Sequence, residues 1–183
     1  MKINMLKVMN FEAMIYLPKW NEDGSLSTIV IRTDGLQEEA IFPTVLMDAA
    51  LRFYGSSLQG AKDGTRSILG EISMQPVVVS DKFGLYWFPS TSPANLDCVW
   101  FALHHVDHYR AIDEKRISVV MMNGTEITVE TSLYSFDRKV KRASHLRCQL
   151  EGRQAYQVKE RQVSYYIIKK LEDRNYDIDE FYE

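Results

Sequence analysis

The chain has 183 residues, of which 45% are hydrophobic and 11% aromatic, enough apolar material for the core of a folded domain. No apolar run approaches the ~20 residues of a membrane-spanning helix. The N-terminal residues MKINMLKVMNFEAM lack the continuous apolar stretch of a secretory signal. Two cysteines, Cys98 and Cys148, are too few for a disulfide framework, so we expect free thiols and a cytoplasmic protein.

The formal charge of −3 is unevenly distributed along the chain. The last segment, LEDRNYDIDEFYE (171–183), holds six acids and one base, which leaves 21 bases and 19 acids in residues 1–170. The segment RKVKRASHLR (138–147) holds five bases, one histidine and no acid. A local basic patch matters more for binding a polyanion than the total charge does.

The first third of the chain predicts a strand hairpin and then a helix. Two segments rich in β-branched and aromatic residues, FEAMIYLP (11–18) and LSTIVIRT (26–33), flank the turn-forming pair Asp23-Gly24. EEAIF (38–42) is read as a third strand. Apolar residues then recur at helical spacing, namely Val45, Leu46, Ala49, Ala50 and Phe53. We therefore expect a helix over 44–54, with Gly55 as its C-cap.

The rest of the chain predicts five strands and two helices. The expected strands are RSILGEIS (66–73), FGLYWFP (83–89), CVWFALHHVDHY (98–109), KRISVVMM (115–122) and TEITVETS (125–132). Asn123-Gly124 predicts a two-residue hairpin turn between the last two. A helix is predicted over 133–151, because its apolar residues share one face, and a last helix from about Ser164 to Arg174.

Helices placed between and after antiparallel strands indicate an α+β fold and not a doubly wound parallel sheet. We expect mostly antiparallel sheet with a helix near 44–54, a basic helix near 133–151 and a C-terminal helix. One α+β domain is expected over 1–160. The C-terminal helix and the acidic tail are expected over 161–183.

The segment GSSLQGAKDGTR (55–66) has nearly the spacing of a phosphate-binding P-loop. The lysine comes one residue late, at Lys62, and Asp63 stands where a hydroxyl would hold magnesium. The segment also follows a predicted helix, whereas a P-loop follows a strand. We expect a glycine loop, with Arg52, Ser56, Ser57, Lys62 and Arg66 around it, that is either a plain surface turn or, taken with the basic helix described below, a loop that approaches the DNA backbone.

Catalytic and metal sites are not indicated. In LHHVDHY (103–109), a strand places His104 and His108 on one face without a third ligand, and no paired-cysteine spacing occurs. His145 and Cys148 are neighbours on a predicted helix, but neither an orienting acid nor oxyanion donors accompany them. We therefore predict no catalytic residue, no metal, no cofactor and no enzymatic activity.

The basic face of the helix over 133–151 is the other candidate for DNA contact. Arg138, Lys141, Arg142 and His145 fall together opposite the apolar face, where Arg and Lys could neutralise phosphates. An ordinary solvated helix face is the alternative. The predicted DNA-binding residues are Arg52, Ser56, Ser57, Lys62, Arg66, Arg138, Lys141, Arg142 and Arg147.

Over residues 45–153 the sequence resembles the competence transcription factor ComK family of Gram-positive bacteria. The resemblance rests on RFYGSSLQGAKDGT, on the late basic segment SFDRKVKRASHLR, and on single positions between them. Those positions are Pro76, Phe88-Pro89, Trp100, His105 and Asn123-Gly124. The first 40 residues and the acidic end match the family poorly.

The resemblance implies a sequence-specific DNA-binding activator of genes for DNA uptake. It implies binding to paired A-rich and T-rich boxes through the minor groove, as dimers that assemble into tetramers on DNA. It also implies proteolytic control through an adaptor of a Clp protease, for which SYYIIKK (164–170) is the candidate contact. The absence of a helix–turn–helix or zinc signature agrees with minor-groove reading, where inserted arginine is favoured.

Two alternatives remain open from the sequence. The acidic overall balance suits a protein-interaction regulator that has lost DNA binding. A nucleotide-binding enzyme that uses the Gly55–Gly64 segment is the other, against which stand the absent lysine at position 61 and the absent hydroxyl at position 63.

Overall fold

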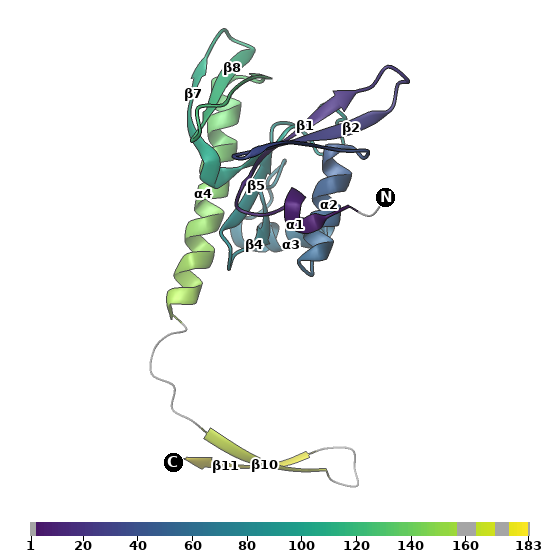
Figure 1. Ribbon diagram of the computed structural model, residues 1–183. Helices are drawn as coiled ribbons and strands as arrows, with labels where there is room; N and C mark the ends of the chain where they lie inside the picture. The colour runs from purple at the N-terminus through teal and green to yellow at the C-terminus, as the bar shows by residue number, and fades with distance from the viewer. Residues whose placement is uncertain (1–2, 157–163, 171–175, 183) are drawn as a thin grey trace. The chain divides into compact units, whose positions relative to one another are not determined.

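A sheet of six antiparallel strands with the order β3-β2-β1-β6-β5-β4 forms the centre of the fold (Figure 1). The strands are β1 (Ala13–Trp20), β2 (Leu26–Arg32), β3 (Gly35–Glu39), β4 (Val77–Ser80), β5 (Leu85–Pro89) and β6 (Trp100–Ala102). This computed structural model describes residues 3–156, 164–170 and 176–182, in two units, Met1–Glu151 and Gly152–Glu183. No helix of the described residues is long and apolar enough to cross a membrane.

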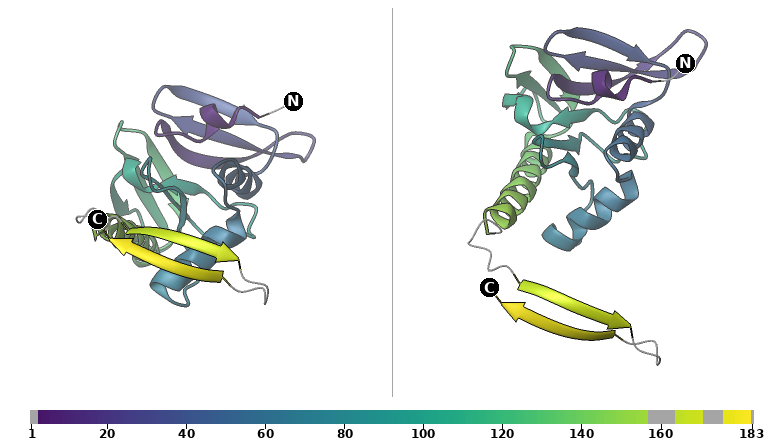
Figure 2. Two further views of the ribbon diagram at one scale, coloured as in Figure 1. Left: turned by 90° about the horizontal axis from the view of Figure 1, so that it is seen from below. Right: turned by 60° about the horizontal axis from the view of Figure 1, so that its bottom comes forward.

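Three helices cover one face of the six-stranded sheet. They are α1 (Met5–Val8), α2 (Pro43–Phe53) and α3 (Leu58–Leu69), and α2 and α3 lie side by side (Figure 2). Because successive side chains of a strand point to opposite faces, Tyr16, Trp87 and Trp100 pack into the core under these helices. Phe88 and Phe101 point the other way, into a second core.

The second core lies between the six-stranded sheet, a three-stranded sheet and the last helix. The small sheet has the order β7-β8-β9, and the helix follows it directly. The bounds are β7 (Val106–Ala111), β8 (Arg116–Met121), β9 (Glu126–Glu130) and α4 (Leu133–Tyr156). The ring of Phe136 from α4 lies with its centroid 5.5 Å from that of Phe88, 5.4 Å from Phe101 and 5.0 Å from Tyr109. This aromatic cluster joins α4 to both sheets.

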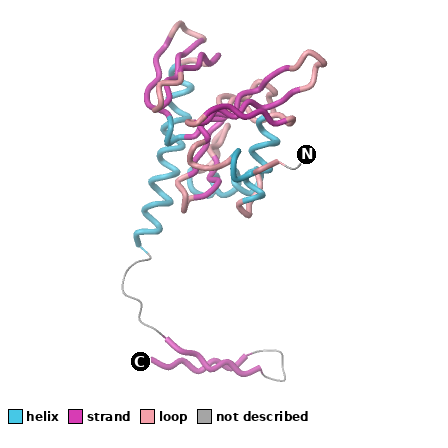
Figure 3. The backbone as a smooth tube through the Cα atoms, viewed as in Figure 1, coloured by secondary structure: helices cyan, strands magenta, loops and turns pink. Residues whose placement is uncertain are grey.

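The second unit contains an antiparallel hairpin of β10 (Ser164–Lys170) and β11 (Tyr176–Tyr182) (Figure 3). The prediction of a last helix from Ser164 to Arg174 is therefore wrong over 164–170. The run Tyr-Tyr-Ile-Ile at 165–168 has the β-branched and aromatic residues that favour strands. Residues 171–174 of that prediction lie outside the described residues.

The α+β fold class and the helices predicted over 44–54 and 133–151 are confirmed, and α4 continues to Tyr156. The glycine loop predicted at 55–66 is wrong, because most of it lies in α3, and so is the strand predicted at 66–73. The third strand, β3, begins three residues before the predicted segment 38–42 and overlaps it only at residues 38 and 39. The short elements α1 and β4 were not predicted.

Helix α3 forms in spite of two internal glycines, each of which costs ~1 kcal/mol relative to alanine. Its start is held by Ser57, whose hydroxyl accepts from the amide of Gly60 at 3.0 Å, and by Asp48, which accepts from the amide of Leu58 at 2.7 Å. Its inner face carries Thr65, which donates to the carbonyl of Pro76 at 2.8 Å. Capping and tertiary packing thus override a poor propensity.

Two turns differ in detail from the sequence prediction. The hairpin at Asn123-Gly124 is confirmed, but Met121 donates its amide to the carbonyl of Thr125, so three residues form the loop. Gly124 has a φ of +85°, which favours glycine at this position. The strand predicted over 98–109 is interrupted by a short 3-10 turn at Leu103–His105, so the alternation argument for His104 and His108 does not hold.

The 3-10 turn holds the segment before β1. The Nε2 atoms of His104 and His105 lie 3.2 Å and 2.6 Å from the carbonyl oxygen of Phe11, to which each donates. The ring of Phe11 stacks on His104 with the centroids 4.2 Å apart. Burial lowers the pKa of His104 to about 4.

Phe136→Ala should destabilise the fold by about 3–5 kcal/mol, because it empties the centre of the aromatic cluster. The free energy of unfolding in urea measures this effect. Tyr134→Ala on the exposed side of the same helix is the control and should cost no more than about 1 kcal/mol. An equal loss in both variants would contradict the packing described for α4.

Lowering the pH from about 6.5 to about 4 should weaken the fold through His104. In this window the unfolded chain takes up a proton on the imidazole that the folded protein does not accept, so unfolding becomes more favourable. His104→Gln retains an N–H donor without titrating, so its stability should fall less between pH 7 and pH 5. The exposed His108→Gln is the control and should follow the wild type. Parallel curves for all three proteins would rule out this role for His104.

Candidate nucleic-acid interface

The nine residues predicted to bind DNA fall into two groups in the structure. Arg52, Ser56, Ser57, Lys62 and Arg66 lie on α2, on α3 and on the connection between them. Arg138, Lys141, Arg142 and Arg147 lie on α4. The two regions meet near Ser73, whose carbonyl accepts from Nη1 of Arg142 at 3.1 Å. This contact joins the middle of α4 to the segment that follows α3.

The outer face of α4 is basic, as the spacing predicted. Arg138 and Lys141 are exposed there, and the buried residues of the helix, among them Phe136 and Leu146, lie on the opposite side. Arg147 is not part of this face. It lines a cavity of about 420 Å³ together with His104.

One base of the segment 138–147 is buried. Lys139 is only 3% exposed, and its Nζ donates to the hydroxyl of Ser135 at 2.9 Å. Burial lowers the pKa of this ammonium group, because the charged form loses its hydration. The five bases of the segment therefore do not form one surface, and the sequence overstated its positive charge.

Carboxylates of the same chain pair with four of the nine predicted residues. Nitrogen–oxygen distances of 2.7 Å to 3.2 Å join Arg52 to Asp48, Arg66 to Asp63 and Glu71, Lys141 to Asp137, and Arg147 to Glu151. Exposed pairs of this kind stabilise a fold by only ~0–1 kcal/mol. They therefore lower the positive potential of the surface without tying these side chains firmly.

Asp137 has a hydrogen-bond donor on each of its two carboxylate oxygens. Lys141 donates to its Oδ2 at 2.7 Å, and the hydroxyl of Tyr109 donates to its Oδ1 at 3.0 Å. These hydrogen bonds lower the pKa of Asp137, and the one from Lys141 has the largest effect. The carboxylate is thus held ionised directly beside the basic face of α4.

Lys62, Arg138 and Arg142 are the predicted bases that have no carboxylate within 4.0 Å among the described residues. The guanidinium of Arg138 lies 5.5 Å from the ring centroid of Tyr134, one turn earlier on α4. Two of these three bases belong to α4. Helix α4 is consequently the better candidate for an interface with a polyanion.

The region of α2 and α3 is chiefly structural. Ser57 caps α3, and the hydroxyl of Ser56 donates to the carbonyl of Ser57 at 3.4 Å. Gly60 and Gly64 lie inside the helix and not in a phosphate-binding loop, which removes the structural basis for the nucleotide-enzyme alternative.

Helices α2 and α3 follow one another with a short connection, as the two helices of a helix–turn–helix do. The sequence did not predict this arrangement, because residues 55–66 were expected to form a loop. Four residues join them, and Gly55 among these has a φ of +89°. The exposed side of α3 is nevertheless occupied by an internal network, in which Gln59 and Arg66 both donate to Asp63 at 2.9 Å and 3.0 Å. Few donors remain there for the edges of bases.

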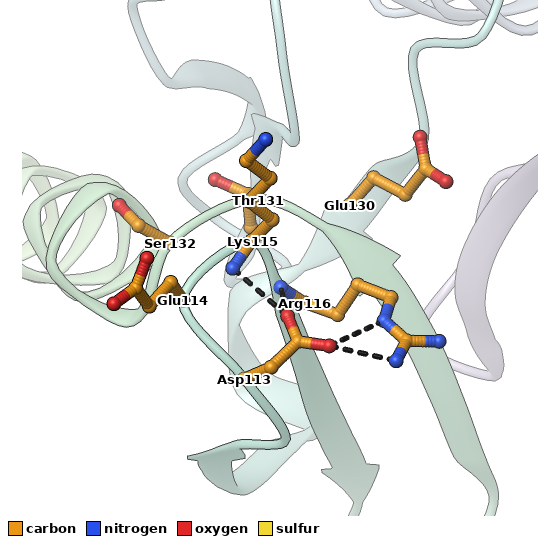
Figure 4. Close-up of a pocket in the computed structure, with 7 residues that line it drawn as sticks. All are labelled: Asp113, Glu114, Lys115, Arg116, Glu130, Thr131 and Ser132. Carbon is orange, nitrogen blue, oxygen red and sulfur yellow. Dashed lines mark hydrogen bonds and ion pairs between the residues drawn. The ribbon is translucent and has the colours of Figure 1, made fainter.

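A cavity of about 830 Å³ lies where the β7–β8 turn meets the start of α4 (Figure 4). Its lining is Asp113, Glu114, Lys115, Arg116, Glu130, Thr131 and Ser132. Asp113 accepts from Nε of Arg116 at 2.7 Å, which neutralises one of its two bases. Since acids outnumber bases, the cavity does not suit a polyanion.

Among the described residues, no group of three His, Cys, Asp or Glu side chains could hold a metal ion. The sequence analysis missed the carboxylates Asp137 and Glu151, which stand just outside the acid-free segment. The i, i+4 rule for helix ion pairs could have found both, because they lie four residues from Lys141 and Arg147. Tyr134 was also not among the residues predicted from the sequence.

Comparison with known proteins identifies the family of the chain. Over 140 residues the chain is 28% identical to the competence transcription factor of Bacillus subtilis (strain 168), covering 76% of this chain and 73% of that protein. No solved structure matches the chain. The family model described as ComK protein matches residues 6–155, which include both cores and all nine predicted residues. The chain therefore belongs to the ComK family.

Proposed function

We propose that the chain is a regulator of competence genes that binds double-stranded DNA and activates transcription. The family and the name of the Bacillus subtilis relative support a role in the transcription of competence genes. The observation that carries DNA binding is the outer face of α4, where Arg138 and Lys141 are exposed and Arg142 lies beside them. Such a face can neutralise phosphates and release counterions.

The dimensions of α4 limit how it would meet DNA. An α-helix with side chains is about 10–12 Å wide, and the minor groove is about 6 Å wide. We therefore infer that α4 lies on the sugar–phosphate backbone, outside the groove, and that arginine side chains reach into the groove. A/T-rich boxes suit this arrangement, because their narrow minor groove has an enhanced negative potential.

Other parts of the proposal rest on the family resemblance alone. They are dimers and tetramers on DNA, a contact of the C-terminal region with a Clp-protease adaptor, and a cytoplasmic, nucleoid-associated location. The division into a DNA-binding domain over 1–160 and a C-terminal contact region over 161–183 is likewise a proposal. We expect the chain to catalyse no reaction, because its proposed function is to bind DNA.

A second candidate function is a protein-interaction regulator that does not bind DNA. The ion pairs of α4 favour it, and so does an apolar cavity of about 360 Å³. Four exposed side chains line that cavity, Leu6, Phe11, Phe53 and Phe83. Exposed apolar clusters of this kind often mark contacts with other proteins.

The chain should bind a duplex with spaced A- and T-rich boxes more tightly than one in which the boxes are G·C. A third duplex with inosine·cytosine boxes separates the grooves, because inosine lacks the amino group that marks guanine in the minor groove. Minor-groove reading predicts that the inosine duplex binds like the A/T duplex. Fluorescence anisotropy across a salt series gives the affinities. If all three duplexes bind equally, base-specific reading is excluded.

Arg138→Ala and Lys141→Ala should each weaken binding to the A/T duplex and lower the slope of log K against log salt by about 0.9. Lys115→Ala, which removes an exposed base from the β7–β8 turn, is the matched control and should leave the slope unchanged. If Lys115→Ala lowered the affinity and the salt slope equally, the effect would not be specific to α4, and this would contradict an interface on that helix.

Asp137→Asn should strengthen DNA binding, because it removes the carboxylate that competes with phosphate for Lys141. The asparagine oxygen can still accept from Tyr109, so the fold should be retained. We expect several-fold higher affinity at low salt, since one favourable charge is worth roughly 1 kcal/mol there. Asp113→Asn, which frees Arg116 in the acidic cavity, should have no such effect. Unchanged affinity of Asp137→Asn would show that Lys141 does not contact phosphate.

A further inference from the structure

Tyr134 is a strongly exposed aromatic side chain, with 71% of its surface open to solvent. Its hydroxyl has no hydrogen-bond partner among the described residues. The centroid of its ring lies 5.5 Å from the guanidinium carbon of Arg138. Packing of the fold therefore does not explain why a large ring stands at this position. A partner that covered an exposed ring of this size would gain free energy from removing its apolar surface from water.

The ring stands at the first turn of α4, on the face that carries the bases. Tyr134, Arg138, Lys141 and His145 follow one another at spacings of four, three and four residues, which places them on one side of a helix. At 1.5 Å per residue this row is about 16 Å long. Along B-DNA that length corresponds to roughly five base pairs.

An aromatic ring at the end of a basic row has a known use in nucleic-acid recognition. Bases stack on aromatic rings whatever their sequence, and apolar wedges part neighbouring base pairs in the minor groove. Arginine beside the ring adds a cation–π contact and a charge that attracts the backbone. Leu133, which is also exposed, adds a second apolar side chain at the same end of α4.

We propose that Tyr134 inserts its ring at a flexible base step at one end of the contact made by α4, while Arg138 holds the ring and contacts the adjacent phosphate. This inference rests on the proposed function and adds a sequence requirement to it. Steps such as TA unstack easily, whereas uninterrupted A-tracts are stiff. Tyr134 thereby selects A/T sites that contain a TA step, although it forms no hydrogen bond to a base edge.

The test compares the wild type with three variants on two duplexes of equal A/T content, one with a TA step in each box and one with uninterrupted A-tracts. Tyr134→Ala should lose about tenfold in affinity on the TA duplex and little on the A-tract duplex. Tyr134→Phe should behave like the wild type, because stacking needs the ring and not the hydroxyl. Phe83→Ala removes a ring that is 54% exposed in the β4–β5 turn, and this control should bind both duplexes normally.

A direct readout comes from 2-aminopurine placed at the TA step, whose fluorescence rises when the base is unstacked. The wild type and Tyr134→Phe should raise it, and Tyr134→Ala should not. The inference is overturned if Tyr134→Ala binds both duplexes as the wild type does, or if the fluorescence change survives in it, while A/T preference and the salt slope would still support the proposed function. If the wild type binds neither duplex, the proposed function itself fails, and the exposed ring would then favour a protein partner.

Discussion

The burial of both faces of the six-stranded sheet is the constraint on which the rest of the structure depends. Strands β5 and β6 are buried along their whole length, so each face needs a cover. Helices α1 to α3 cover one face, and the three-stranded sheet with α4 covers the other. The ring of Phe136 lies among rings of both sheets, which fixes the rotation of α4 about its axis. The basic face of α4 is therefore directed outward because of an apolar contact on its inner side.

Binding of a phosphate at the basic face of α4 would require a base to exchange its carboxylate partner for the phosphate. Lys141 already has a carboxylate, that of Asp137, at 2.7 Å. A phosphate group that approaches α4 would replace a carboxylate and not fill a vacant position, so the gain per contact is smaller than for a free base. This competition explains how a chain with a net charge of −3 could bind DNA at specific sites without holding every polyanion it meets.

The two helical regions differ in what their polar residues do. On α2 and α3, the side-chain oxygens of Asp48 and Ser57 accept from amides at the start of α3, and Asp63 accepts from a neighbouring side chain. On α4, the partners of Arg138 and Arg142 within the described part of the chain are a ring and a backbone carbonyl, respectively. Free donors therefore gather on α4, although the glycine-rich segment of α3 carries the more conspicuous sequence pattern.

The sequence by itself determined the α+β class, the helices at 44–54 and 133–151, the hairpin at Gly124 and the basic spacing of α4. These follow from local periodicity and turn chemistry, which neighbouring residues set. Only the tertiary structure decided that residues 58–69 form a helix, because Thr65 and the caps outweigh the glycines, and that 164–170 pair as a strand. It also turned Lys139 inward and placed acids beside Lys141 and Arg147. A single linear pattern does not show which side of a helix the core will cover, and that choice decides which charges reach the surface.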